Sequence, residues 1–273
     1  MTRLALLGFP LDGALSPVLH QAAYAAMGLP WTYHAIECLP QDLPRFLDTL
    51  DDSWGGFSLT MPLKRTVVPL LDEVSETVSR IGAANTVVVT PGGRLVGENT
   101  DLYGMVQALR DAGVTTAPGV TVLGAGATAC TALAAAYELG CDQAVVIARD
   151  TGRARSLLGA TAERIGITAT IEPWAAAGYH LATDLVVSAL PPYAADALAP
   201  LWTPGTGILM DVVYRPWPSR FAHAAQEAGR RVVGGLPMLV HQAARQVVLQ
   251  TGHSPAPVTK MLLASQSEIH QFE

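Results

Sequence analysis

The sequence predicts an α/β protein of two domains, and three observations lead to this prediction. Strand-like and helix-like segments alternate along most of the 273 residues, a glycine-rich turn directly follows an apolar strand at Gly124, and the stretch from Pro237 onward has helical patterning only. Alternation of this kind favours parallel sheets covered by helices. We expect one domain over residues 1–102 plus 238–273 and a second over residues 103–237, so that the C-terminal helices return to the first domain.

The first domain begins with an apolar strand over residues 4–11 and a helix over residues 16–29. In this helix we expect Ser16 at the N-cap, Pro17 at the first helical position and Gly28 just past the end. The further elements expected here are strands over 31–38 and 55–61, helices over 43–50 and 67–76, and a β-hairpin formed by 85–90 and 94–100.

The second domain begins with a helix over residues 102–113 that ends at Gly113. Residues 115–119 contain proline and glycine and are typical of a linker. A more regular β-α-β pattern follows, with strands over 121–126, 143–150, 184–191 and 207–214, helices between them, and a final helical part that starts with 237–252.

The glycine-rich turn has the pattern G-x-G-x-x-(G/A), in which Gly124, Ala125, Gly126 and Ala127 are followed by Ala129. One glycine permits the tight turn, and the next lets the backbone approach a pyrophosphate whose charge lies at a helix N-terminus. The pattern alone is weak, because glycine-rich turns are common. Its place in a strand–turn–helix–strand unit indicates a dinucleotide site.

The second strand of that unit ends in Arg149 and Asp150, where ribose specificity is usually set. Arg149 and Arg153 would bind a 2′-phosphate by bidentate hydrogen bonds, which favours NADP. Asp150 would accept from a free 2′-hydroxyl and repel a phosphate, which favours NAD; it would also serve as the N-cap of the next helix. We expect NADP, with NAD as the alternative.

The composition excludes several classes of partner. A formal net charge of −6 with scattered basic residues disfavours nucleic acid or an anionic membrane as the partner. The three cysteines have neither paired nor metal-type spacing, and the seven histidines form no HxH or HxxxH pair, so we expect no metal site. No signal peptide or membrane-spanning run is recognised. We expect a cytoplasmic monomer or homodimer that binds a small-molecule substrate.

The position of Lys64 indicates proton chemistry. Only two of the seventeen basic residues are lysines, Lys64 and Lys260. Arginine keeps its proton near neutral pH, whereas a lysine side chain releases one when its surroundings depress its pKa. A chain that otherwise uses arginine for positive charge therefore marks Lys64 as a candidate catalytic residue. The alternative is a solvated lysine in the first turn of a helix.

Seven motifs occur in the order found in the shikimate dehydrogenase family, which the chain resembles from about residue 8 to about residue 250. They are ALSP (14–17), SLTMPLK (58–64), IGAANT (81–86), GENTD (97–101), GAGATA (124–129), DVVYRPWP (211–218) and GGLPMLVHQ (234–242). The resemblance implies an N-terminal substrate domain and a Rossmann-type nucleotide domain. It also implies reversible NADP-dependent reduction of 3-dehydroshikimate to shikimate, in aromatic amino-acid biosynthesis.

The resemblance implies that Lys64 and Asp101 form the catalytic acid–base pair. The chemistry agrees, because hydride delivery to a ketone leaves negative charge on oxygen, and an ammonium beside a carboxylate can supply the proton. Asp101 alone has another interpretation, as the cap of a helix that starts at Leu102.

The resemblance also assigns substrate and cofactor contacts to single residues. The substrate carboxylate is expected at Ser16 and Tyr214, and the nicotinamide at Met238. The ring hydroxyls are expected at Thr60, Asn85 and Gln242. The structural alternatives are a helix cap for Ser16, a strand end for Thr60, a turn for Asn85 and core packing for Met238.

The chain departs from the family pattern at three positions. Ala14 stands where the family usually has serine, so one donor to the substrate carboxylate is missing, which is worth about 1.5–3 kcal/mol. Asp150 replaces a hydroxyl residue, and Ser58 replaces an asparagine. Because of Ala14 and Asp150, an alternative remains: the protein would be a paralogue that acts on quinate or aminoshikimate, with NAD as its cofactor. A folate-linked dehydrogenase and a catalytically inactive nucleotide sensor are further alternatives, disfavoured by GENTD and by the pair of Lys64 and Asp101.

Overall fold

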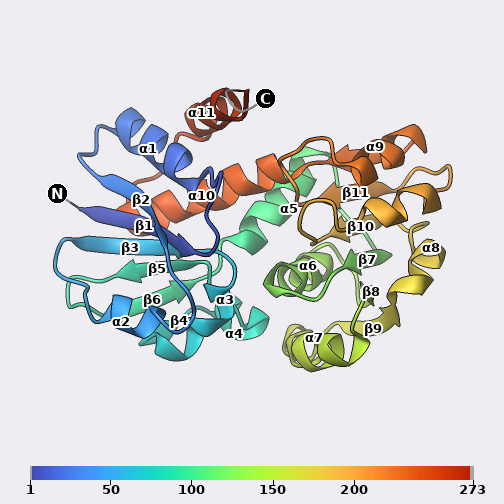
Figure 1. Cartoon of the computed structure of the whole chain (residues 1–273), viewed down its shortest axis with the longest axis horizontal. Helices are drawn as coiled ribbons and strands as arrows, with labels where there is room; N and C mark the ends of the chain where they lie inside the picture. Colours follow the sequence, from blue (N-terminus) through green and yellow to red (C-terminus); the bar gives the residue numbers. More distant parts are fainter. Residues whose placement is uncertain (1, 271–273) are drawn as a thin grey trace. The chain divides into compact units, whose positions relative to one another are not determined.

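The computed structural model describes residues 2–270, and its chain forms two compact units. Unit 1 comprises Met1–Gly104 and Val240–Glu273, and unit 2 comprises Met105–Leu239 (Figure 1). Each unit contains one six-stranded sheet with helices packed on it. The predicted α/β class is therefore confirmed.

The sheet of unit 1 is mixed, with strand order β2-β1-β3-β5-β6-β4. The first three strands in this order are mutually parallel, whereas β5 runs antiparallel to both β3 and β6, which confirms the predicted hairpin. The strands are β1 (Arg3–Gly8), β2 (Thr32–Glu37), β3 (Trp54–Leu59), β4 (Glu73–Val74), β5 (Thr86–Val89) and β6 (Leu95–Glu98).

Alternate residues of these strands face opposite layers of unit 1. Leu7 and Phe57 belong to a fully buried cluster together with Leu43 and Leu63, which come from helices α2 and α3. The opposite face is covered by α10, to which Ser58 of β3 is hydrogen-bonded. The helices are α1 (Ser16–Met27), α2 (Leu43–Leu47), α3 (Leu63–Thr66), α4 (Glu76–Ile81), α10 (Gly235–Thr251) and α11 (Val258–His270), and α5 (Asp101–Asp111) starts here.

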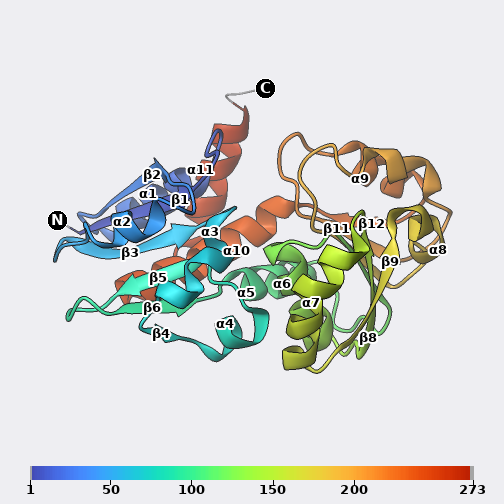
Figure 2. The ribbon, with the colours of Figure 1, turned by 60° about the horizontal axis from the view of Figure 1, so that its bottom comes forward.

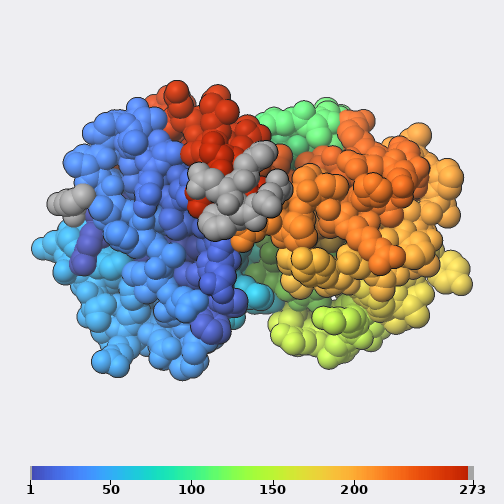
Figure 3. All heavy atoms as spheres, turned by 45° about the horizontal axis from the view of Figure 1, so that its top comes forward, coloured from blue at the N-terminus to red at the C-terminus, as the bar shows by residue number. Residues whose placement is uncertain are grey.

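The end of the chain packs on its beginning within unit 1. Helix α11 contacts α1, and Figure 3 shows the red surface of the C-terminal segment against the blue surface of the N-terminal segment. The C-terminal helices thus belong to the same compact unit as β1.

The sheet of unit 2 is entirely parallel, with strand order β12-β11-β10-β7-β8-β9. The order reverses between β7 and β10, which is the arrangement of a dinucleotide-binding α/β sheet with its switch point there. The strands are β7 (Val120–Leu123), β8 (Gln143–Ala148), β9 (Thr168–Pro173), β10 (Leu185–Ser188), β11 (Ile208–Asp211) and β12 (Arg231–Val233).

The helices of unit 2 cover both faces of its sheet. Helices α6 (Ala127–Glu138) and α7 (Thr151–Ile165) lie side by side (Figure 2). On the other side, α9 (Arg220–Glu227) packs Phe221 and Ala222 into a buried cluster with Leu123 and Leu209. Helix α8 (Ala177–His180) and two 3-10 segments, Trp174–Ala176 and Asp196–Leu201, complete the unit.

The predicted helix over residues 67–76 is wrong. The chain forms a 3-10 turn at Val68–Leu70 and then the short strand β4, which pairs with β6. The backbone stays helical through Pro69 and becomes extended at Leu71, with φ −95° and ψ 145°. Asp72 N and Ser75 N then donate to Leu95 O and Gly97 O of β6, so pairing with this strand replaces the predicted helix. The next helix, α4, starts only at Glu76, where the Ser75 hydroxyl accepts a hydrogen bond from Val78 N at 3.3 Å.

The predicted N-cap at Ser16 is also wrong. Leu15 occupies the cap position with φ −84° and ψ −11°, and Ser16 is the first helical residue. Because the backbone is already helical at Leu15, the serine hydroxyl does not cap the helix. The predicted end at Gly28 is confirmed, since this glycine adopts a left-handed conformation with φ 67°. Within the described part of the chain, no helix combines the length and apolar character needed to cross a membrane.

Candidate active site

Lys64 and Asp101 form a close ion pair in unit 1. Lys64 lies on the short helix α3, which follows the end of β3, and Asp101 is the first residue of α5, which follows β6. The Lys64 Nζ atom donates to Asp101 Oδ2 at 2.6 Å, with side-chain exposures of 16% and 7%. Helix α3 is held by the fully buried Leu63 and by a hydrogen bond from Ala84 N to Lys64 O of 2.8 Å. The ammonium therefore has a defined, largely buried position.

Asn85 holds the other oxygen of the Asp101 carboxylate. Its Nδ2 atom donates to Asp101 Oδ1 at 2.9 Å and lies 3.1 Å from Gln242 Oε1. The Asn85 Oδ1 atom accepts from Thr100 N at 2.8 Å, which fixes the orientation of the amide. The structure thus brings together four residues predicted from the sequence, namely Lys64, Asn85, Asp101 and Gln242.

Asn99, rather than Asp101, provides the helix cap at the start of α5. Its Oδ1 atom accepts from Leu102 N at 3.3 Å, and its Nδ2 atom donates to Ala83 O at 2.8 Å. The alternative interpretation of Asp101 as a simple cap is therefore wrong. Both oxygens of Asp101 face polar side chains of the cluster instead.

Helix α10 supports the cluster through Gln246, a residue that the sequence did not single out. Its Nε2 atom donates to Asn85 O at 3.2 Å and to Thr86 Oγ1 at 3.0 Å, and its Oε1 atom accepts from Ser58 Oγ at 3.0 Å. Gln246 lies four residues after Gln242, so both glutamines occupy one face of the helix. This spacing is the signal that would have revealed it.

Ser16 and Thr60 lie in unit 1, and neither hydroxyl forms a hydrogen bond to this cluster within residues 2–270. Ser16 is buried, and its hydroxyl is not used as a cap. Thr60 directly follows β3; its N–H donates to Leu7 O at 2.9 Å, and its carbonyl accepts from Leu63 N at 2.8 Å. Thr60 therefore ends the strand and starts the turn into α3, as its structural alternative predicts.

The glycine-rich turn of unit 2 leaves space in front of a helix N-terminus. Gly124 has φ 110°, and a Cβ atom there would lie 3.0 Å from Ala189 O, so glycine is required. Gly126 precedes α6, where no side chain caps the helix, and a Cβ atom there would meet nothing within 4 Å. Open space beside uncapped backbone donors fits a bound pyrophosphate. Ala125 and Ala127 flank this position and are partly exposed.

Asp150 is the N-cap of α7, which confirms its structural alternative. Its Oδ1 atom accepts from Arg153 N at 2.9 Å. Arg149, Asp150 and Arg153 are all exposed, so the carboxylate and both guanidinium groups are accessible at the end of β8. Arg149 and Arg153 could donate hydrogen bonds to a 2′-phosphate, and Asp150 could accept one from a free ribose hydroxyl.

Tyr214 and Met238 lie in unit 2. Tyr214 follows β11 and is half-buried, and burial raises the pKa of its hydroxyl. Met238 is buried on the first turns of α10. Among residues 2–270, no three His, Cys, Asp or Glu side chains gather in a way that would hold a metal ion.

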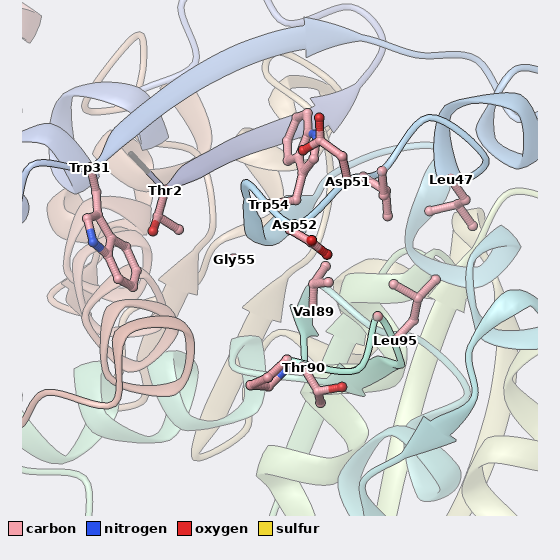
Figure 4. Close-up of a pocket in the computed structure, with 13 residues that line it drawn as sticks. Thr2, Trp31, Leu47, Asp51, Asp52, Trp54, Gly55, Val89, Thr90 and Leu95 are labelled. Atoms are coloured by element: carbon pink, nitrogen blue, oxygen red, sulfur yellow. The ribbon is translucent and has the colours of Figure 1, made fainter.

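A cavity of about 570 Å³ in unit 1 does not coincide with the Lys64 cluster. Figure 4 shows Trp31, Trp54, Asp51 and Asp52 around it, close to the start of β3. Lys64 follows the opposite end of this strand. A second cavity, of about 710 Å³, lies in unit 2.

Comparisons with known proteins find similar sequences and similar folds over nearly the whole chain. Residues 6–87 match the model of the shikimate dehydrogenase substrate binding domain. A shikimate dehydrogenase (NADP(+)) from Thermus thermophilus is 37% identical and aligns over 94% of this chain and 95% of its own length. A crystal structure from the same species, in complex with NADP(H) and shikimate, is 35% identical with a TM-score of 0.85 and covers 98% of this chain and 100% of its own. A quinate dehydrogenase from Corynebacterium glutamicum in complex with NAD is 28% identical with a TM-score of 0.85, covering 97% of this chain and 99% of its own.

Proposed function

The chain belongs to the shikimate dehydrogenase family, and we propose that it catalyses the reversible NADP-dependent reduction of 3-dehydroshikimate to shikimate in aromatic amino-acid biosynthesis. The observation that carries this proposal is the ion pair of Lys64 and Asp101, whose Nζ and Oδ2 atoms are 2.6 Å apart. A binding protein without catalysis has no need of such a proton donor.

Lys64 acts as the acid in ketone reduction and as the base in alcohol oxidation. When bound, the reduced nicotinamide supplies the hydride that the ketone carbon accepts. The ketone oxygen then carries negative charge, and the Lys64 ammonium donates a proton to it. Asp101 stabilises that ammonium and holds it in place. Lys64 is partly exposed, so it regains its proton from solvent. In the reverse direction, neutral Lys64 takes the proton of the substrate hydroxyl.

The side chains around this pair bind the substrate. Asn85 and Gln242 would hydrogen-bond the ring hydroxyls, together with Thr60. Ser16 and Tyr214 would bind the carboxylate, and the Ser16 hydroxyl is suited to this because it does not cap its helix. Hydrogen bonds to a charged carboxylate are each worth about 1.5–3 kcal/mol.

Unit 2 would hold the cofactor. Its pyrophosphate would lie against Gly124, Ala125, Gly126 and Ala127 at the N-terminus of α6, and the open space at Gly126 supports this. Arg149 and Arg153 would bind the 2′-phosphate, with Asp150 beside them. Met238 would pack against the nicotinamide.

The roles of the two domains, the cellular location and the oligomeric state complete the proposal. The substrate belongs to the domain built mainly from residues 1–102, and the dinucleotide to that built from 103–237. We place the protein in the cytoplasm, which is supported by the buried thiols of Cys38, Cys130 and Cys141. The oligomeric state would be monomer or homodimer.

A second candidate function is the oxidation of quinate or aminoshikimate with NAD. Two observations favour it, namely the missing hydroxyl at Ala14 and the exposed carboxylate of Asp150. A structural relative that is a quinate dehydrogenase in complex with NAD adds support.

One experiment separates the two candidates. The purified protein is assayed with shikimate, quinate and aminoshikimate, each with NADP and with NAD, and kcat/KM is fitted from the absorbance of the reduced cofactor. We expect shikimate with NADP to give the highest value. A higher value with another polyol or with NAD would favour the second candidate, and no turnover with any pair would contradict both.

A further inference from the structure

We propose that unit 2 carries a second small-molecule site, in which Arg230 binds the phosphate or carboxylate group of a small oxyanion. The site is the cavity of about 710 Å³. Its lining includes Thr183, Asp184, Gly205, Thr206, Gly207 and Arg230.

Arg230 is a buried cation that lacks an anionic partner. Only 7% of the residue is exposed, and its Nε atom is buried without a hydrogen-bond partner. Its Nη2 atom donates to Thr203 O at 3.3 Å, and the guanidinium lies 5.5 Å from the ring centroid of Trp202. The ion pairs found within residues 2–270 do not include Arg230. Burial of a cation is costly unless an anion or several acceptors compensate for its lost hydration.

The absence of a side chain at Gly205 leaves room for the guanidinium of Arg230 against the backbone. A Cβ atom at Gly205 would lie 2.5 Å from Arg230 Nη2, with the other guanidinium atoms next nearest. One at Gly207 would meet the backbone oxygen of Thr183 first and would also lie 2.5 Å from Nη1. A side chain at Gly205 would therefore displace the guanidinium, whereas one at Gly207 would clash with the backbone as well. Glycine at position 205 therefore lets the charged group lie against the backbone, where Arg230, which lines the cavity, can donate to an oxyanion.

The other polar groups of the cavity refine the class of ligand. Asp184 is exposed, and its Oδ2 atom accepts from Gly119 N at 2.9 Å. Thr183 and Thr206 add hydroxyl groups, which both donate and accept. A carboxylate near the cation disfavours a highly charged anion. The cavity therefore fits a small oxyanion that also carries an O–H or N–H donor for Asp184.

This cavity is distinct from the proposed dinucleotide site. Its residues Pro118 and Asp184 precede β7 and β10, so it lies at the amino-terminal edge of the parallel sheet. The glycine-rich turn follows the carboxyl end of β7. The four residues of this strand separate the two edges by about 13 Å, at about 3.3 Å per residue. Ligands of such sheets normally bind at the carboxyl edge, so the cofactor does not account for this cavity.

The test uses the full-length protein and compares anions at constant ionic strength. Inorganic phosphate and glycolate are titrated against chloride, and the melting temperature is followed. We expect phosphate or glycolate to raise the melting temperature of the wild type. The increase should be lost in Arg230→Met, which removes the charge but keeps an unbranched side chain. The double variant Arg149→Ala/Arg153→Ala is the matched control, because it removes the two exposed arginines proposed for the cofactor, and it should keep the increase.

The two anions distinguish a phosphate-type from a carboxylate-type ligand. No increase in the wild type, or an increase of the same size in Arg230→Met, would overturn the proposal, whatever the Arg149/Arg153 variant shows. If Arg230→Met does not fold, wild-type crystals are soaked in selenate. An anomalous peak within hydrogen-bond distance of the Arg230 guanidinium would support the site, and peaks only elsewhere would refute it.

Discussion

The Nζ atom of Lys64 lies 2.6 Å from the Oδ2 atom of Asp101, although the two residues are 37 positions apart in the chain. Asn85 holds the second carboxylate oxygen at 2.9 Å. The Lys64 ammonium, the Asp101 carboxylate and the Asn85 amide therefore form one hydrogen-bonded cluster. A change in one of them is expected to alter the others.

Replacing Lys64 with alanine should reduce kcat by about 10²- to 10⁴-fold, because the proton donor is lost. The KM for NADP should change little, since the lysine belongs to unit 1 and the proposed cofactor residues to unit 2. Lys260→Ala is the matched control, because it removes the only other lysine, which is exposed on α11. Steady-state kinetics check both variants. A Lys64→Ala enzyme that keeps most of its kcat would contradict the catalytic role.

Replacing Asn85 with alanine should destabilise the protein by about 1–3 kcal/mol, because Thr100 N loses its acceptor in a buried site. The kcat value should fall as well, since Asp101 loses one of its two partners. Urea unfolding and kinetics of the same preparation measure the two effects. Unchanged stability and activity together would show that the Asn85 amide is dispensable.

Replacing Ala14 with serine should lower the KM for shikimate by about tenfold or more, because a hydroxyl donor to a charged carboxylate is worth about 1.5–3 kcal/mol. Ala14→Cys is the control, because it adds a side chain of similar size whose S–H group is only a weak donor. If serine leaves the KM unchanged while shikimate is already a good substrate, another group binds the carboxylate in its place.

Replacing Asp150 with threonine should increase the ratio of kcat/KM for NADP to that for NAD. Threonine also caps helices, so it preserves the start of α7 while it removes the negative charge. The stability of this variant should therefore remain close to that of the wild type, unlike that of Asp150→Ala. An unaltered cofactor ratio would mean that Asp150 acts only as the cap.

His20 should make the protein sensitive to acid. Burial lowers the pKa of His20 to about 4, against an ordinary value of 6.5. Between these two pH values the unfolded chain binds a proton that the folded protein does not, so stability falls as the pH drops from 6.5 towards 4. The loss should reach about 3 kcal/mol at the lower end, and stability above pH 6.5 should not depend on this group.

His20→Phe isolates this effect. The imidazole stacks on Tyr33 with ring centroids 3.9 Å apart, and phenylalanine can keep that contact. In the wild type, the His20 Nδ1 atom is hydrogen-bonded to Ser16 O at 2.9 Å, and the phenylalanine variant would lose this bond. We expect a less acid-sensitive variant when unfolding free energies are measured from pH 7 to pH 4. An identical pH profile in both proteins would assign the acid sensitivity to other groups.

Features that depend on a few neighbouring residues were predictable from the sequence. The glycine-rich turn at Gly124, the helix end at Gly28 and the β5–β6 hairpin each follow from local backbone preferences. The importance of Lys64 followed from composition, because lysine is rare in this chain. The helix predicted over residues 67–76 failed for the opposite reason, because backbone pairing of residues 72–75 with the more distant strand β6 replaced it.

The tertiary structure alone decided what each polar side chain contacts. Whether Asp101 caps a helix or pairs with Lys64 depends on how α3 and α5 pack, and the sequence allowed both. The spacing from Gln242 indicates the helix face of Gln246, but not that it supports Asn85 across 161 positions. Nor does a local pattern reveal that Arg230 is buried and that no ion pair within residues 2–270 includes it. The physical reason is range: backbone preferences act within a few residues, whereas burial and hydrogen bonding between distant segments exist only once the chain has packed.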